Sequence, residues 1–325
     1  MSVAVYEKST STFTRATKPS FPGVVRGEIF KQTHSRPVLG LAIMVLVTAA
    51  LPALFLALSP NTKTTLASTP DIFYFTVMNV DLSVLRIFVG VFVLIATALL
   101  VGQEYQNGTI RVLLSRGVDR VQLLLAKLLA MSLLALGLLA VALIVVALSS
   151  LLGIQVAAGS LDSLKVLNGD FWHSTWIYLL TVLISVGVSI LLAACVAVVG
   201  RSLAFGVSAA IGWFAADNIG VLVMLLVYRF TQNEFWEQIT GYFLGPILNT
   251  MPAAVVPALP ISVTALNGAV IHATFPAQVI GIPPLVNYDG THALVVTLVY
   301  AVVLFAVAVI LTWRRDVKEW GRPHP

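Results

Sequence analysis

Six long apolar runs, separated by shorter polar stretches, set the pattern of this chain. An α-helix needs about 20 mostly apolar residues to cross roughly 30 Å of hydrocarbon, and each run reaches that length. Uninterrupted runs predict helices, because the strands of a membrane barrel would show segments of about ten residues with alternating polarity. We therefore expect an all-α integral membrane protein. Its predicted transmembrane helices cover residues 38–58, 82–102, 122–152, 175–199, 205–228 and 291–313.

The polar stretches around these runs suggest a division into domains. The first 20 residues are rich in Ser and Thr, which predicts a disordered tail. Phe21, Val25 and Ile29 then recur at every fourth position, a spacing typical of an amphipathic helix on a membrane surface, although a solvated start of the first span would also fit. The expected domains are a disordered cytoplasmic tail (1–20), an interfacial helix (21–37), a six-span domain (38–313) and a second cytoplasmic tail (314–325).

The segment between the last two spans, residues 229–290, differs from the other loops. It holds seven of the fifteen prolines and is nevertheless largely apolar. No piece between these prolines is long enough to cross a membrane as a helix. Irregular backbone at membrane depth is tolerated only where protein or water surrounds it. We expect an external cap with one re-entrant piece.

Composition supports the membrane assignment and sets an orientation. Apolar residues make up 58% of the 325 residues and charged residues only 10%, against about 25% in soluble domains. The net charge of +5 does not indicate nucleic-acid binding, because the basic residues follow the loops. With the N-terminus in the cytoplasm, fifteen lysines and arginines lie inside and four outside. The positive-inside rule therefore predicts that both termini lie in the cytoplasm. We expect a multi-pass protein of the plasma membrane.

The densest polar cluster, VGQEYQNGTIRVLLSRGVDRVQLLLAKLLA, lies at residues 101–130 between the second and third runs. Its cytoplasmic segment, 103–121, predicts a short helix at about 107–116, because Asn107 and Thr109 are favoured N-cap types. Gly117 is a plausible helix stop. Asp119, three residues before Gln122, then resembles a capping box that opens the third span.

Two charged residues flank this predicted helix. Glu104 is expected where the second span meets water, and Lys127 is expected to snorkel back to the interface. Arg86, near the outer end of the second span, is likewise expected to snorkel, with Asp81 as a possible partner. Charge alone fits an ordinary cytoplasmic loop of a membrane protein.

The order of residues in this stretch resembles the segment between spans two and three of ABC-2-type transporter permeases. The family pattern is Glu, an aromatic residue, Gly-Thr, Arg, two leucines, Arg, and a Lys in a leucine-rich helix. Gly117 stands where the family usually has proline. The matching residues are Glu104, Tyr105, Gly108, Thr109, Arg111, Leu113, Leu114, Arg120 and Lys127.

The resemblance implies a transport subunit driven by another chain. In that family the short helix is a coupling helix that docks on a separate ABC ATPase, which binds ATP and magnesium. Arg111 and Arg116 would face that ATPase. Two permease chains, identical or paralogous, work with two ATPases, and the resemblance favours an exporter.

Motifs for chemistry within the chain itself are missing from the sequence. There is no G-x-x-x-x-G-K-[ST] loop for phosphate, no G-x-S-x-G elbow, and no metal-binding spacing among the five dispersed histidines. We therefore predict a subunit that is not an enzyme and has no cofactor or metal of its own. The alternatives are an ion-coupled secondary carrier, or a membrane enzyme that would combine Asp217 with residues such as His272 or Asp289.

Asp217, beside Asn218 in the fifth run, is the other singular feature of the sequence. An acid within a span is costly unless it is paired, protonated or facing water. One interpretation is that Asp217 and Asn218 line the translocation path. The other is that they bond a neighbouring span or cap a broken helix.

Overall fold

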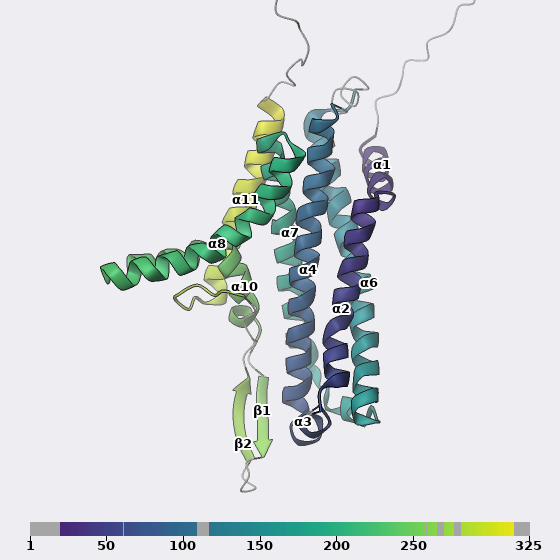
Figure 1. The fold of residues 1–325 in the computed structure, drawn as a ribbon, viewed down its shortest axis with the longest axis vertical. Coiled ribbons are helices and arrows are strands. Elements are labelled where there is room, and N and C mark those ends of the chain that lie inside the picture. The colour runs from purple at the N-terminus through teal and green to yellow at the C-terminus, as the bar shows by residue number, and fades with distance from the viewer. Residues whose placement is uncertain are drawn as a thin grey trace, which may run out of the picture.

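The computed structural model describes residues 20–60, 62–108, 117–257, 259–264, 270–275 and 281–314, the two strands by their backbone only. Six of its helices are long and apolar enough to cross a membrane (Figure 1). The prediction of an all-α membrane protein with six spans is confirmed. The spans are α2 (Arg36–Leu58), α4 (Pro70–Gln106), α6 (Arg120–Ala158), α7 (Gly169–Gly200), α8 (Leu203–Thr231) and α11 (Gly290–Arg314).

Local sequence signals mark several helix ends. Proline occupies the first turn of α1 (Phe21–Thr33), of α2 and of α4, where its missing N–H has no intrahelical partner to lose. Asp119 caps α6, and Gly159 ends it with a φ of 79°. Such ends depend on a few adjacent residues, which is why the sequence predicts them.

Helix α4 is longer than the hydrophobic run that predicts it. It begins at Pro70, although residues 70–81 belong to a stretch that reads as a polar loop. Phe73, Phe75 and Met78 are buried in this extension, so packing rather than hydropathy sets its length. A short helix, α3 (Thr62–Ser68), precedes it.

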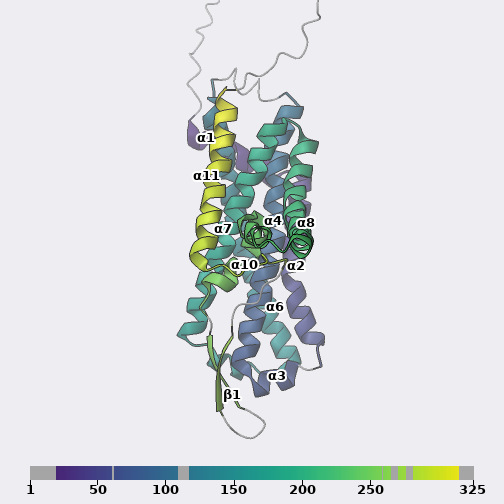
Figure 2. The same cartoon turned by 90° about the vertical axis from the view of Figure 1, so that its left-hand side faces the viewer.

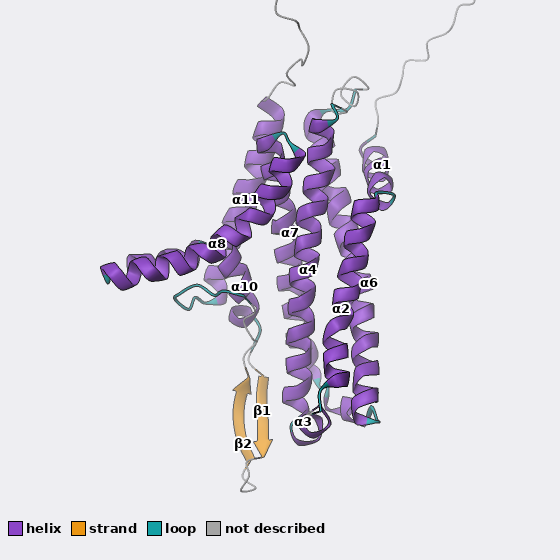
Figure 3. Ribbon diagram, in the orientation of Figure 1, coloured by secondary structure: helices purple, strands orange, loops and turns teal. Residues whose placement is uncertain are grey.

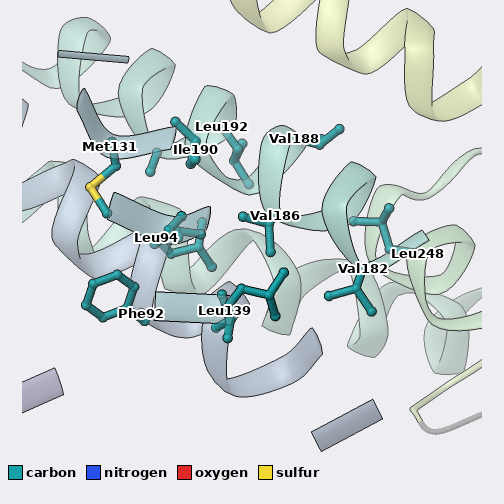
Figure 4. Close-up of a cluster of buried hydrophobic side chains, with 14 of the residues drawn as sticks. Phe92, Leu94, Met131, Leu139, Val182, Val186, Val188, Ile190, Leu192 and Leu248 are labelled. Atoms are coloured by element: carbon teal, nitrogen blue, oxygen red, sulfur yellow. The ribbon is translucent and has the colours of Figure 1, made fainter. Parts of the chain in front are cut away.

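The core lies between α4 and α7, the two most buried spans (Figure 4). About two-thirds of the apolar stretch of each is buried, against 11% for α8. In Figure 1, α8 turns away from the bundle and its second half points sideways. Most of the α8 surface is therefore left uncovered by the rest of the described chain.

The segment between α8 and α11 has several short elements. They are α9 (Phe235–Gln238), η2 (Ile239–Tyr242), α10 (Leu244–Val255), β1 (Leu259–Thr264) and β2 (Val270–Phe275); η1 (Asp162–Val166) lies earlier, before α7. The strands pair antiparallel, from Leu259 opposite Phe275 to Thr264 opposite Val270. They are the only strands among the described residues, and they form a small addition to the helical fold that the sequence did not predict.

The two ends of the bundle differ. Helix α1, the ends of α4 and α11, and the start of α6 lie at one end, which we call the loop end (Figures 1 and 2). Helix α3 and the hairpin lie at the other, which we call the hairpin end; Figure 3 shows the hairpin as the only strands drawn.

Candidate functional site

Four charged side chains, three buried and one partly exposed, form a cluster at the loop end that we call the charged joint. They are the buried Glu28 of α1, Glu104 of α4 and Lys127 of α6, and the partly exposed Lys31 of α1. Lys127 Nζ lies 2.7 Å from Glu104 Oε1 and 3.0 Å from Glu28 Oε2. Lys31 Nζ lies 2.8 Å from the same Glu104 oxygen and 4.0 Å from Glu28 Oε2. Two lysines and two glutamates thus alternate in one ring with no net charge.

Burial makes this joint energetically important. Glu104 and Lys127 are 2% and 4% exposed, and Glu28 is 6% exposed. A buried ion is tolerated when it is paired and hydrogen-bonded, and removing one partner leaves the other uncompensated. The expectation that Lys127 snorkels to the interface is wrong: its amine turns inward, where Glu28 and Glu104 neutralise it.

Small residues bring α1 close enough to complete the joint. Val25 of α1 packs against Ala126 and Ala130 of α6, which are fully buried. Their short side chains let the two helices approach, so that Glu28, one turn after Val25, reaches Lys127. The buried stripe of α1 therefore includes an acid, where the apolar spacing alone suggested only hydrophobic contacts.

The joint lies at the base of the predicted coupling segment. Tyr105 is half-buried against the core, Gly108 has a φ of 66°, and Arg120 opens α6. Asp119 Oδ2 accepts hydrogen bonds from the backbone N–H groups of Val121 (3.2 Å) and Gln122 (3.4 Å), so the predicted N-cap is confirmed. Thr109, Arg111, Leu113, Leu114 and Arg116 lie outside the described residues.

Asp217 and Asn218, the residues proposed for a translocation path, both contact α10. Asp217 Oδ2 accepts a hydrogen bond of 3.0 Å from the backbone N–H of Gly245, in the first turn of α10. A Cβ at Gly245 would lie 3.2 Å from Asn218 Nδ2 and 3.3 Å from Asp217 Cβ, so glycine permits this approach. A carboxylate at a helix N-terminus is stabilised by the helix dipole. The geometry favours helix capping for Asp217.

Asn218 continues this set of contacts. Its Oδ1 accepts a hydrogen bond of 3.1 Å from Asn249 Nδ2 of α10. Asn249 Nδ2 also donates to the Ile282 carbonyl at 3.2 Å, beyond the hairpin. The polar pair of α8 thus fixes α10 and the segment that follows it.

Arg86 does not snorkel, so that expectation is also wrong. Its side chain is buried at 4% exposure, and its Nη1 donates a hydrogen bond to the backbone carbonyl of Leu248 in α10. Asp81, one turn earlier, accepts a hydrogen bond of 3.0 Å from the Ser150 hydroxyl of α6. Ser83 and Tyr178 bond each other at 2.6 Å between α4 and α7. One stretch of α4 therefore holds three other helices.

The segment before α11 is tied down by aromatic residues. Tyr288 stacks on His292 at 4.1 Å between ring centroids, and its hydroxyl donates to the Gln238 carbonyl at 2.7 Å. Burial, with Tyr242 nearby, raises the pKa of Tyr288 above its ordinary value, so the hydroxyl stays protonated and donates. Within the described ranges, no group of three or more His, Cys, Asp or Glu side chains could hold a metal ion.

Sequence reasoning missed Glu28 and Lys31 as members of the site. The sequence does carry a signal, because the spacing of Val25, Glu28 and Gln32 puts them on one face of a helix. The structure buries this face. An acid on the buried stripe of a helix indicates a basic partner on the surface it covers.

Comparison with known proteins gives one match. The model of the ABC-2 family transporter proteins matches residues 24–216, which is more than half of the chain. The matched part begins inside α1, ends beside Asp217, and contains all four residues of the charged joint. No curated protein matches the chain. This multi-pass membrane protein therefore belongs to the ABC-2 family of transporter proteins.

Proposed function

We propose that this chain is the transmembrane permease subunit of an ATP-driven exporter, coupled to a separate ABC ATPase through the loop between α4 and α6. The charged joint is the observation that supports this most directly. It locks three elements together at the base of that loop. A loop with no mechanical role would not need three buried charges behind it.

Motion would pass from the loop into the membrane through rigid helices. Glu104 lies in the last turn of α4, and Lys127 lies two turns into α6. Because their ion pair is buried, displacing one helix relative to the other would expose or separate the charges at a cost of several kcal/mol. A push on the loop would therefore move α4, α6 and α1 together.

The partner chain would bind and hydrolyse ATP. In this proposal two ABC ATPases bind ATP and magnesium, and two permease chains, identical or paralogous, enclose the substrate path. The loop end faces the cytoplasm, in keeping with the fifteen to four distribution of basic residues. The permease itself would carry out no catalytic step.

The role of Asp217 in this scheme follows from its contacts. It would keep α10 in place rather than bind a transported ion, since its carboxylate already accepts a hydrogen bond from the first turn of that helix. Asn218 would act with it through Asn249.

Charge reversal at the loop tests this proposal. Arg111→Glu with Arg116→Glu should weaken binding of the ATPase by tenfold or more, because two favourable contacts become repulsive. Affinity would be measured between the purified permease in lipid nanodiscs and the ATPase encoded nearest to it. Lys63→Glu, at the hairpin end, is the matched control and should leave binding unchanged. If the parent, the double arginine variant and Lys63→Glu all bound the ATPase with equal affinity, the loop would not be the site of coupling.

A further inference from the structure

Helix α10 is short, interrupted by proline and deeply buried. It packs against α7, α8 and α11. Leu248 reaches the main core, close to Val182 of α7 (Figure 4). Met251, one turn from the end of α10, is 1% exposed. A buried helix of this kind must satisfy its backbone polar groups inside the protein.

Pro252 creates a gap in that hydrogen bonding. In an α-helix the carbonyl of residue i accepts from the N–H of residue i+4, so Leu248 would be bonded by residue 252. Proline has no N–H to donate. Leu248 is 3% exposed, so bulk water does not reach it. A buried carbonyl in this position needs a donor from elsewhere.

Arg86 of α4 fills this gap. Its Nη1 donates to the Leu248 carbonyl, 162 residues away in sequence. A hydrogen bond from a charged donor is stronger than a neutral one, and the buried setting strengthens it further. The backbone of α10 is thus completed by a side chain of another helix.

We propose that Arg86 is a positioning residue that completes the backbone of α10 and so couples this helix to α4. That a motion passes along α4 rests on the proposed function. Helix α4 carries Glu104 of the charged joint 18 residues after Arg86, about 27 Å along one uninterrupted helix. Under the proposed function, displacement of α4 at the loop end would therefore act on α10 through the hydrogen bond from Arg86.

The first turn of α10 is held by a different span. Asp217 of α8 bonds the backbone of Gly245, while Arg86 of α4 bonds the backbone of Leu248, three residues later. Two spans therefore hold α10 by its backbone, in addition to its packing against α7, α8 and α11.

The exchange Pro252→Ala gives a direct test, because an alanine at this position restores the N–H that the Leu248 carbonyl lacks. The reporter is Met251→Cys in a chain whose single native cysteine is changed, Cys195→Ser. Its buried thiol reacts with a maleimide only when α10 opens. In purified protein without ATPase, Arg86→Met should raise the labelling rate at least tenfold, about 1.4 kcal/mol. Adding Pro252→Ala should return the rate to within about threefold of the parent.

The control uses the intrahelical proline of α2. Adding Pro52→Ala to Arg86→Met should give no such recovery, because Pro52 is not in α10. Unchanged labelling in Arg86→Met, or equal recovery with either alanine, would overturn the proposal. If Arg86→Met cannot be purified, the double variant with Pro252→Ala must be recoverable, and its loss would also overturn it. A failure here leaves ATPase binding at the loop intact and so does not touch the proposed function.

Discussion

At the scale of single residues, Lys127 is the centre of the charged joint. It contacts both glutamates, whereas Lys31 is partly exposed and could be replaced by water or a counter-ion. Lys127→Met leaves two buried carboxylates facing one partly exposed cation. The free energy of unfolding should fall by about 3–5 kcal/mol, the range for breaking a buried pair. The measurement is the fraction of monodisperse protein that remains after a series of heating steps in detergent.

Lys165→Met is the matched control for this prediction. Lys165 also forms an ion pair, with Asp162 at 3.0 Å, but both side chains are more than three-quarters exposed. Exposed pairs contribute little because water and salt screen them. The control should therefore unfold at the same temperature as the parent protein. If Lys127→Met also unfolded at that temperature, the charged joint would not contribute to the stability of the fold.

How well a charged residue can be assigned from sequence depends on the distance to its partner. The N-cap role of Asp119 is predictable, because its partners lie two and three residues ahead. From the sequence, Lys127 and Arg86 are expected to snorkel, because each lies near a predicted membrane interface. Glu28 lies 99 residues from Lys127 and the Leu248 carbonyl lies 162 residues from Arg86, and only the packing of α1 and α10 brings these partners together.

At the scale of helices, α2 and α6 meet through a glycine. A Cβ at Gly153 would lie 2.8 Å from the carbonyl oxygen of Ala53, so any larger residue must push the helices apart. Gly153→Ala should destabilise the protein by about 1–3 kcal/mol, as overpacking does in cores. The change would be read from the midpoint of thermal unfolding followed by circular dichroism.

Gly137 of the same helix supplies the comparison. No atom outside its own neighbourhood lies within 4 Å of a Cβ at this position. Gly137→Ala should be neutral, or stabilising by up to about 1 kcal/mol, because alanine favours the helix. The contact between α2 and α6 would be discounted if both variants showed the same midpoint.

The helices also show where hydropathy stops being informative. Six apolar runs were enough to predict six spans, because membrane thickness sets their length. The same pattern could not predict the extension of α4, whose residues 70–81 are held by buried aromatic contacts. Nor could it place α10, where prolines interrupt the run and polar groups of α4 and α8 complete the helix.

At the scale of the whole molecule, helix α4 links the charged joint to α10. It contributes Glu104 to the charged joint and Arg86 to α10, and about two-thirds of its apolar stretch is buried. Helices α2, α8 and α11 are largely exposed by comparison. A long buried helix with polar contacts at its middle and at its loop end suits the transmission of force between these two levels of the bundle.

The central claim is that another chain supplies the energy for transport. The most direct measurement is purification of this protein from its native membranes in a gentle detergent, followed by mass spectrometry of the proteins that accompany it. We expect a stoichiometric ABC ATPase, which is lost when Arg111 and Arg116 are changed to glutamate. If the chain purified alone and transported its substrate without ATP, an ATPase partner would be excluded as its source of energy.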